Sequence, residues 1–203
     1  RAPEDRRARL RPAGLSGEQL AALRARIGLD LGGREPAEIG LAIVAWERGE
    51  LDQATMYQER AVAAWRAGGN ESLIAAGLFN LALILHSAGN DQAALPLVRE
   101  ARQLRAERFG TGHELVGDSD RLLGEILAAL GHTEPAHAAL RNAVRVTRAG
   151  FGPTHSHTRR TEISLARFEA SGGDPAAYQR LRALGKPNDG DIEQRKASWL
   201  ARA

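Results

Sequence analysis

Histidines and carboxylates occur in pairs along the chain, and these are the residue types of metal sites and of acid–base catalysis. His155 and His157 are two residues apart, and His132 and His137 are five apart. Two imidazoles share one face of a helix when they are three or four residues apart, so neither pair is placed to chelate a metal ion. No set of acidic ligands completes a zinc site around them. The sequence therefore predicts neither a bound metal nor a cofactor.

Motifs of known enzymes are missing from the sequence. There is no phosphate-binding loop, dinucleotide fingerprint, His-Glu-x-x-His pair, Gly-x-Ser-x-Gly elbow or kinase motif. The chain has no cysteine, which excludes disulfides, thiolate metal sites and a cysteine nucleophile. Glu162 and Glu169 are acidic residues at helical spacing, which is poor evidence for glycosidase chemistry. We expect that the protein is not an enzyme.

Residues suited to binding a polypeptide are easier to find. Asn80 lies inside an apolar run, and its amide can donate to and accept from an extended chain at once. Its other interpretation is a hydrogen bond between neighbouring parts of the fold. Trp46 and Phe79 are either anchors for a ligand or members of the core. Arg121 and the pair Arg159-Arg160 either clamp an acidic or phosphorylated segment or lie on a solvated helix face.

An internal repeat supplies the elements that position these residues. Glycine turns recur at Gly49, Gly89, Gly131 and Gly172, which are 40, 42 and 41 residues apart. Seven residues before the first three glycines the chain has a small residue, and five after every glycine it has alanine. Steps of three, four and seven residues place such positions on one stripe of a helix, and small residues there let two helices approach closely. Each repeat therefore predicts a helix, a tight turn and a second helix.

Two matched segments mark the links between repeats. Phe109-Gly110 precedes His113, and Phe151-Gly152 precedes His155, 42 residues later. We interpret each link as a helix end, a loop plugged by the phenylalanine, and a new helix beginning near the histidine. The expected helices cover about 37–48, 52–67, 72–88, 92–108, 114–130, 134–149, 156–170 and 175–184, with flanking helices at 17–27 and 190–202.

At these residues the chain resembles the tetratricopeptide repeat family, in particular the kinesin-light-chain type with repeats of about 42 residues. The resemblance covers residues 36–184 and departs from the family at Gln58, where an apolar residue is usual, and at Leu165, where a small one is. It implies an all-α superhelix of about four helix-turn-helix repeats, whose first helices line a concave groove for a protein or peptide. By position, the groove residues would be Ile39, Ile43, Trp46, Phe79, Asn80, Leu83, His86, Arg121, Glu125, Arg159, Glu162 and Glu169.

Composition and charge narrow the class further. Apolar residues make up 43% of the chain and aromatic residues 4%, so we expect a core of Ala, Leu, Val and Ile. The net charge is +3, and basic and acidic residues are interspersed along the chain, without the basic stripe of a nucleic-acid-binding protein. No apolar run reaches the roughly 20 residues that span a bilayer, and the lack of cysteine fits a cytoplasmic location. We expect a flexible tail (1–14), a helix with a loop (15–35), the repeat array (36–184) and a capping helix (185–203).

Four functions stay open at this stage, and a binding scaffold for a protein or peptide comes first. A second is a regulatory or sensory part of a larger bacterial signalling enzyme, such as a serine/threonine kinase, or of a transcription regulator, since the resemblance extends to such proteins. A stand-alone hydrolase or metal enzyme finds no motif to support it. Self-association through the apolar ends of the array is the fourth.

Overall fold

A computed structural model of the chain describes residues 37–184, and all regular structure in that range is helical. The chain divides into two compact units, and the boundary between them falls between Leu97 and Val98, within helix α5. We call them unit 1 and unit 2 and describe each by itself. The tail expected at 1–14 and the flanking helices expected at 17–27 and 190–202 lie outside the described residues.

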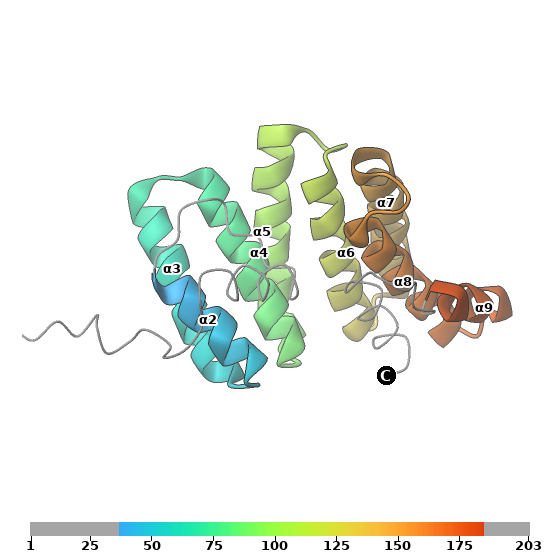
Figure 1. Ribbon diagram of the computed structural model, residues 1–203, viewed down its shortest axis with the longest axis horizontal. Coiled ribbons are helices and arrows are strands. Elements are labelled where there is room, and N and C mark those ends of the chain that lie inside the picture. Colours follow the sequence, from blue (N-terminus) through green and yellow to red (C-terminus); the bar gives the residue numbers. More distant parts are fainter. Residues whose placement is uncertain (1–36, 185–203) are drawn as a thin grey trace, which may run out of the picture. The chain divides into compact units, whose positions relative to one another are not determined.

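The described part of unit 1, residues 37–97, contains three complete helices and the beginning of a fourth (Figure 1). They are α2 (Ala37–Glu47), α3 (Leu51–Gly68), α4 (Glu71–Ser87) and the first residues of α5 (Asp91–Phe109). Helix α3 packs against both α2 and α4. The core is mainly aliphatic, with Ile39 and Ile43 of α2 in one cluster with Trp65 and Leu73. Gln58 is fully buried among these helices and donates from Nε2 to the carbonyl oxygen of Gly77 at 3.2 Å.

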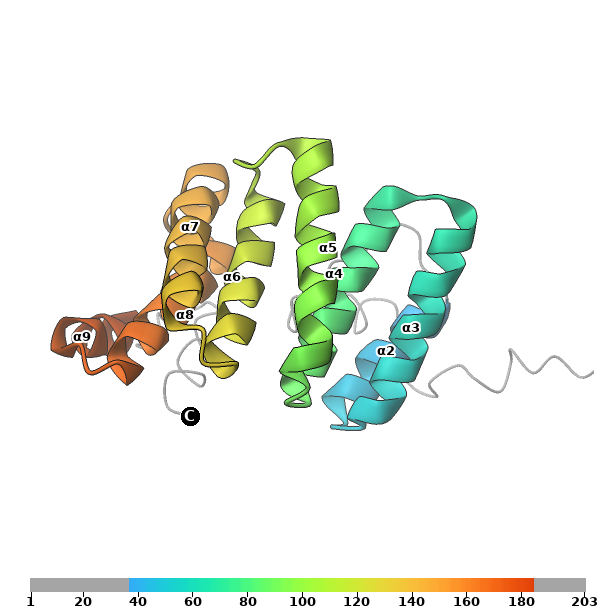
Figure 2. The same cartoon turned by 180° about the vertical axis from the view of Figure 1, so that it is seen from behind.

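The described part of unit 2, residues 98–184, contains the rest of α5 and four further helices (Figure 2). They are α6 (Glu114–Ala129), α7 (Thr133–Phe151), α8 (Ser156–Ser171) and α9 (Pro175–Leu184). Each of these four packs against the next along the chain, and α6 also contacts α8. The expected all-helical fold of helix-turn-helix repeats is thus confirmed, and every expected helix between 37 and 184 ends within two residues of its observed bounds.

Glycines with positive φ end the first helix of each pair, as the repeat predicts. They are Gly49, Gly89, Gly131 and Gly173, with φ between 73° and 90°. In each turn the glycine N–H donates to the carbonyl three residues back, and the next residue donates to the carbonyl five back, as Asp174 does to Glu169. These bonds satisfy carbonyls that a helix end otherwise leaves without partners. Glycine is required because side chains disfavour this left-handed backbone.

The fourth glycine turn lies one residue later than the sequence predicts. Gly172, the expected anchor, has an ordinary φ of −78°, and Gly173 adopts the turn conformation instead. Counting from Gly173 puts the buried Ala166, rather than Leu165, at the small position, so the apparent departure at Leu165 disappears. The spacing from Gly131 becomes 42, which equals the spacing of the two phenylalanine–histidine links. One residue turns a helix by about 100°, so the correction changes which side chains of α8 share a face with those of α6.

The histidines of the links begin helices, as expected. His113 accepts from the N–H of Leu115 at 3.2 Å, and His155 accepts from the N–H of His157 at 3.3 Å, so each imidazole satisfies one free N–H of a helix start. The expectation that the phenylalanines plug the loops is wrong for Phe109, which is 42% exposed. Its ring instead stacks on His113, at 4.6 Å between centroids, and thereby packs against the histidine that caps α6.

Candidate functional site

Helix α6 carries four consecutive polar residues that are all buried, namely Asp118, Ser119, Asp120 and Arg121. Successive residues of a helix point about 100° apart, so the four reach different neighbours. Ser119 receives a hydrogen bond from Arg105 of α5, and Asp120 is bonded by side chains of α5 and α7. Asp118 and Arg121 belong to a cluster on the side of α6 that faces α8. Buried charges need such partners, because leaving water costs several kcal/mol per ion.

The cluster begins with a chain of hydrogen bonds along one face of α6. Arg121 donates from Nε to Asp118 at 3.1 Å and from Nη1 to Glu125 at 2.7 Å. Ser164 of α8 donates its hydroxyl to the other oxygen of Glu125, which links the two helices. The side chains of Asp118 and Arg121 are 4% and 5% exposed, whereas Glu125 is 24% exposed, so within the Asp118–Arg121–Glu125 chain it is Glu125 that solvent or a partner can reach.

His157 of α8 completes the cluster. Its Nδ1 lies 3.8 Å from Asp118 Oδ1, too far for a hydrogen bond, and this buried nitrogen has no hydrogen-bond partner. The imidazole also packs against the Phe151 ring, at 4.9 Å between centroids, and against His155 at 5.5 Å. We call Asp118, Arg121, Glu125, His157 and Ser164 the α6–α8 cluster.

The pKa values within the α6–α8 cluster follow from burial and from the neighbouring charges. Burial alone would raise the pKa of Asp118, but the charges of Arg121, of His157 once it is protonated at low pH, and of Arg160 and Arg105 outweigh it and lower the pKa to about 2. Burial would likewise lower the pKa of Arg121, and the carboxylates of Glu125 and Asp118 raise it instead. For His157 burial dominates: it lowers the pKa, and the attraction of Asp118 does not compensate. The cluster therefore holds a charged Asp118–Arg121–Glu125 chain beside a neutral histidine at neutral pH.

The pH dependence of stability should show two separate windows in unit 2. Because the pKa of His157 is lower in the folded state, the unfolded chain binds a proton first, and stability falls as pH drops below about 6.5. Asp118 stabilises the fold above its unfolded pKa of about 3.9, and this contribution is lost as pH falls from there toward about 2. Thermal unfolding followed by circular dichroism between pH 8 and pH 5 measures the first window.

The matched variants for this measurement are His157→Gln and His132→Gln. His132 is exposed at the start of α7. The His157→Gln variant should lose less stability between pH 8 and pH 5 than the unaltered chain, whereas His132→Gln should follow the unaltered chain. Equal slopes for both variants would show that His157 is not held neutral by its surroundings.

The site residues expected in unit 1 divide by exposure. Ile39, Ile43, Phe79 and Asn80 have no exposed surface, so they lie in the interior in this structure. A partner would reach them only if neighbouring side chains moved. Trp46, Leu83 and His86 are partly exposed. Trp46 and Leu83 pack against the α2–α3–α4 core, and His86 Nδ1 lies 2.5 Å from Asp91 Oδ1 at the start of α5. Contact of any of the seven with a ligand stays a prediction.

In unit 2 Arg121 bonds to Glu125, whereas the three expected residues of α8 bond to partners outside this pair. Arg159 donates to the carbonyl oxygen of Leu184 at 2.9 Å, and Glu162 pairs with Arg148 of α7 at 2.8 Å. Glu169 pairs with His137 of α7 at 3.0 Å and with Arg180 of α9 at 2.6 Å. The corrected register explains this outcome. These three residues were assigned to the groove by their distance from Gly172, whereas the turn is formed by Gly173. Counted from Gly173, the α8 residue in register with Asp118 is Arg160, and the one in register with Asn80 is Ser164.

Three members of the α6–α8 cluster were not expected from the sequence as binding-face residues: Asp118, His157 and Ser164. One signal was present, because Asp118, Arg121 and Glu125 follow steps of three and four and so share a helix face. Within residues 37–184 no group of three histidine, cysteine or acidic side chains is arranged to hold a metal ion. Among the helices described, none is long and apolar enough to cross a membrane.

Antiparallel helix pairs joined by glycine turns, repeated every 40 to 42 residues, define a helical repeat protein. A family model for the tetratricopeptide repeat matches residues 34–107 and again 73–149, which together span more than half of the chain. The chain belongs to the tetratricopeptide repeat family. A second model, for the XdhC Rossmann domain, matches residues 1–46, of which the described part is the helix α2. No curated protein matches the chain.

Solved structures agree with this assignment. The chain is similar to the nearly identical TPR-like repeats assigned to a kinesin light chain of Podospora anserina, with a TM-score of 0.62 and 18% identity over 91% of this chain and 89% of that one. A form of the same protein with one residue substituted gives a TM-score of 0.62 at 17% identity, over 93% and 89%. At this identity the likeness shows the fold. Tetratricopeptide repeats generally mediate contacts between proteins and typically serve as non-enzymatic scaffolds.

Proposed function

We propose that this chain is a scaffold that binds a protein or peptide, and that the first helices of its repeats carry the contacts. The α6–α8 cluster is the observation that supports the proposal most. Its buried members Asp118 and Arg121 fix the side chain of Glu125, which keeps 24% of its surface exposed between two neighbouring first helices. A polar group held in place in this way binds with a smaller loss of side-chain entropy than a free one.

Unit 1 offers a contact of different chemistry. Trp46 and Leu83 come from its first helices α2 and α4 and are partly exposed while they pack on the core. Tryptophan is enriched among the residues that dominate binding energies. The proposal therefore assigns an apolar contact to unit 1 and a charged contact to unit 2, and each is tested separately.

The experiment begins with a random peptide library displayed on phage and selected against the whole chain. Affinities of the selected peptides are then measured by fluorescence anisotropy. Glu125→Gln keeps an oxygen for Arg121, and its amide N–H can donate to the Ser164 hydroxyl, but the exposed charge is removed. We expect this variant to weaken binding about tenfold, or roughly 1.4 kcal/mol. For unit 1, Leu83→Ser reduces the apolar contact, with circular dichroism to confirm folding.

Arg141→Ala provides the control, because Arg141 is an exposed residue of the second helix α7. It should leave the affinities unchanged. Selected peptides that bind Glu125→Gln and Leu83→Ser as tightly as the unaltered chain would refute the role of the first helices. A selection that yields no binding peptide would refute the proposal in its present form.

A further inference from the structure

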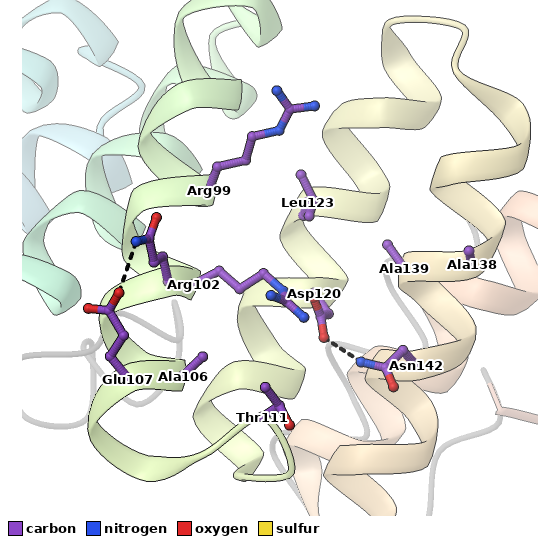
Figure 3. A pocket seen from close by; sticks show the side chains of 11 residues that line it. Arg99, Arg102, Ala106, Glu107, Thr111, Asp120, Leu123, Ala138, Ala139 and Asn142 are labelled. Atoms are coloured by element: carbon purple, nitrogen blue, oxygen red, sulfur yellow. Dashed lines mark hydrogen bonds and ion pairs between the residues drawn. The ribbon is translucent and has the colours of Figure 1, made fainter.

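A hollow of about 730 Å³ lies on unit 2, away from the α6–α8 cluster, between the second helices α5 and α7 (Figure 3). Its size falls within the range of small-ligand pockets, about 300–1,000 Å³. Asp120 of α6 forms the floor. Arg102 reaches down to Asp120 from α5, and Asn142 donates from Nδ2 to its other oxygen at 2.6 Å from α7. The carboxylate of Asp120 is 3% exposed, so this bridge is built into the fold and holds both second helices to α6.

Part of the wall of the hollow is apolar. Leu123 lies between the two second helices, and Ala138 and Ala139 line the α7 side, where larger side chains would fill the space. Figure 3 shows Arg99 extending from α5 toward the space above Leu123, one helical turn from Arg102. The hollow therefore combines a small apolar surface with two guanidinium groups on one side.

The balance of charge sets the chemistry of an occupant. Four ionisable side chains line the hollow, and Asp120 is neutralised by Arg102. Glu107 accepts a hydrogen bond from Gln103 at 2.9 Å, and Figure 3 shows the Glu107 side chain turned away from Asp120. Within residues 37–184, Arg99 is exposed and has neither a hydrogen bond nor an ion pair. Arg102 engages Asp120 through Nε alone, which leaves its terminal N–H groups as further donors.

We propose that this hollow is a second binding site, between α5 and α7 of unit 2, for a polypeptide segment that carries a glutamate or aspartate next to an apolar residue. The carboxylate pairs with Arg99 and with the free N–H groups of Arg102, and the apolar side chain rests on Leu123, Ala138 and Ala139. Arginine suits this role because its planar group binds a carboxylate through two parallel hydrogen bonds. The inference goes beyond the function proposed above, because it uses none of the residues on which that proposal depends, namely Trp46, Leu83 and the members of the α6–α8 cluster.

Three fluorescein-labelled, acetylated hexapeptides test the proposal, each alternating leucine with glutamate, glutamine or lysine. Anisotropy with the whole chain at low salt should show the glutamate peptide binding at least tenfold more tightly than the glutamine peptide, and the lysine peptide no more tightly than glutamine. Arg99→Ala should abolish the preference for glutamate, and Arg99→Lys should restore part of it. Ala139→Trp fills the hollow and should weaken the glutamate peptide at least tenfold.

Two controls make the outcome decisive. Arg141→Ala removes an exposed arginine of α7 that does not line the hollow, and it should leave the glutamate peptide unaffected. Glu125→Gln alters the first-helix face and should do the same, which separates a failure here from a failure of the scaffold proposal. Equal binding of the glutamate and glutamine peptides would overturn the inference. So would a loss with Glu125→Gln, or a glutamate preference that survives Arg99→Ala or Ala139→Trp.

Discussion

Replacing Asp118 by alanine should lower the free energy of unfolding of the α6–α8 region by about 3 kcal/mol. Removing one partner of a buried ion pair typically costs about 3–5 kcal/mol, because the other charge stays buried without compensation. Arg121, 5% exposed, is that other charge. It keeps Glu125 as a partner, so we expect the lower end of the range. Native-state hydrogen exchange of the α6 and α8 amides measures the change region by region, which suits a repeat protein that need not unfold in one step.

Two further variants identify the cause of the Asp118→Ala effect. Glu134→Ala removes an exposed carboxylate from the first turn of α7 and should cost less than about 1 kcal/mol. The double variant Asp118→Leu with Arg121→Met removes both buried charges and leaves Glu125 bonded to Ser164 and partly exposed to water. It should recover part of the stability that Asp118→Ala loses, since an apolar pair avoids desolvation. A loss with Asp118→Ala no larger than that with Glu134→Ala would show that the pair is not a buried one.

Gly124→Ala should also destabilise unit 2, by about 1–3 kcal/mol, although alanine is the better helix former. A Cβ at this position would lie 2.6 Å from Cγ of Leu140 and 3.1 Å from the carbonyl oxygen of Ala136. Leu140 is 1% exposed and the second obstacle is backbone, so α6 and α7 must move apart. Thermal unfolding by circular dichroism gives the sign and size of the change.

The control for Gly124→Ala is a glycine of another helix. Gly68 lies in the last turn of α3, and a Cβ there would meet nothing within 4 Å. Gly68→Ala should therefore leave stability unchanged or raise it by up to about 1 kcal/mol. If both variants behaved alike, the close approach of α6 and α7 at Gly124 would not be a requirement of the fold.

The helices could be predicted closely because their signals are local. Glycine turns need positive φ, and small residues mark the stripes where helices meet, so each helix between 37 and 184 could be placed to within two residues. The fourth repeat shows the limit of this reasoning. Gly172 and Gly173 are adjacent, and only the backbone conformation shows which of them forms the turn.

The site was harder to predict because it depends on how helices rotate against one another. Arg121 and Glu125 were expected on one face, and the structure joins them. The bond from Ser164 to Glu125 connects residues 39 apart, and no local pattern predicts it. Counting from Gly172 instead of Gly173 assigned Glu162 and Glu169 to the expected groove. In the structure Glu162 pairs with α7, and Glu169 pairs with α7 and α9. The chemistry of a binding partner can be inferred only from such contacts between helices, and these are known only once the chain is folded.

Chemical-shift mapping by nuclear magnetic resonance tests the scaffold proposal most directly, with the isotope-labelled whole chain and a peptide from the unbiased phage selection. The proposal predicts that the largest shifts on adding the peptide fall on the first helices, at Glu125, His157 and Ser164 in unit 2 or at Trp46 and Leu83 in unit 1. Shifts confined to α3 and α7, with these five residues unchanged, would contradict it.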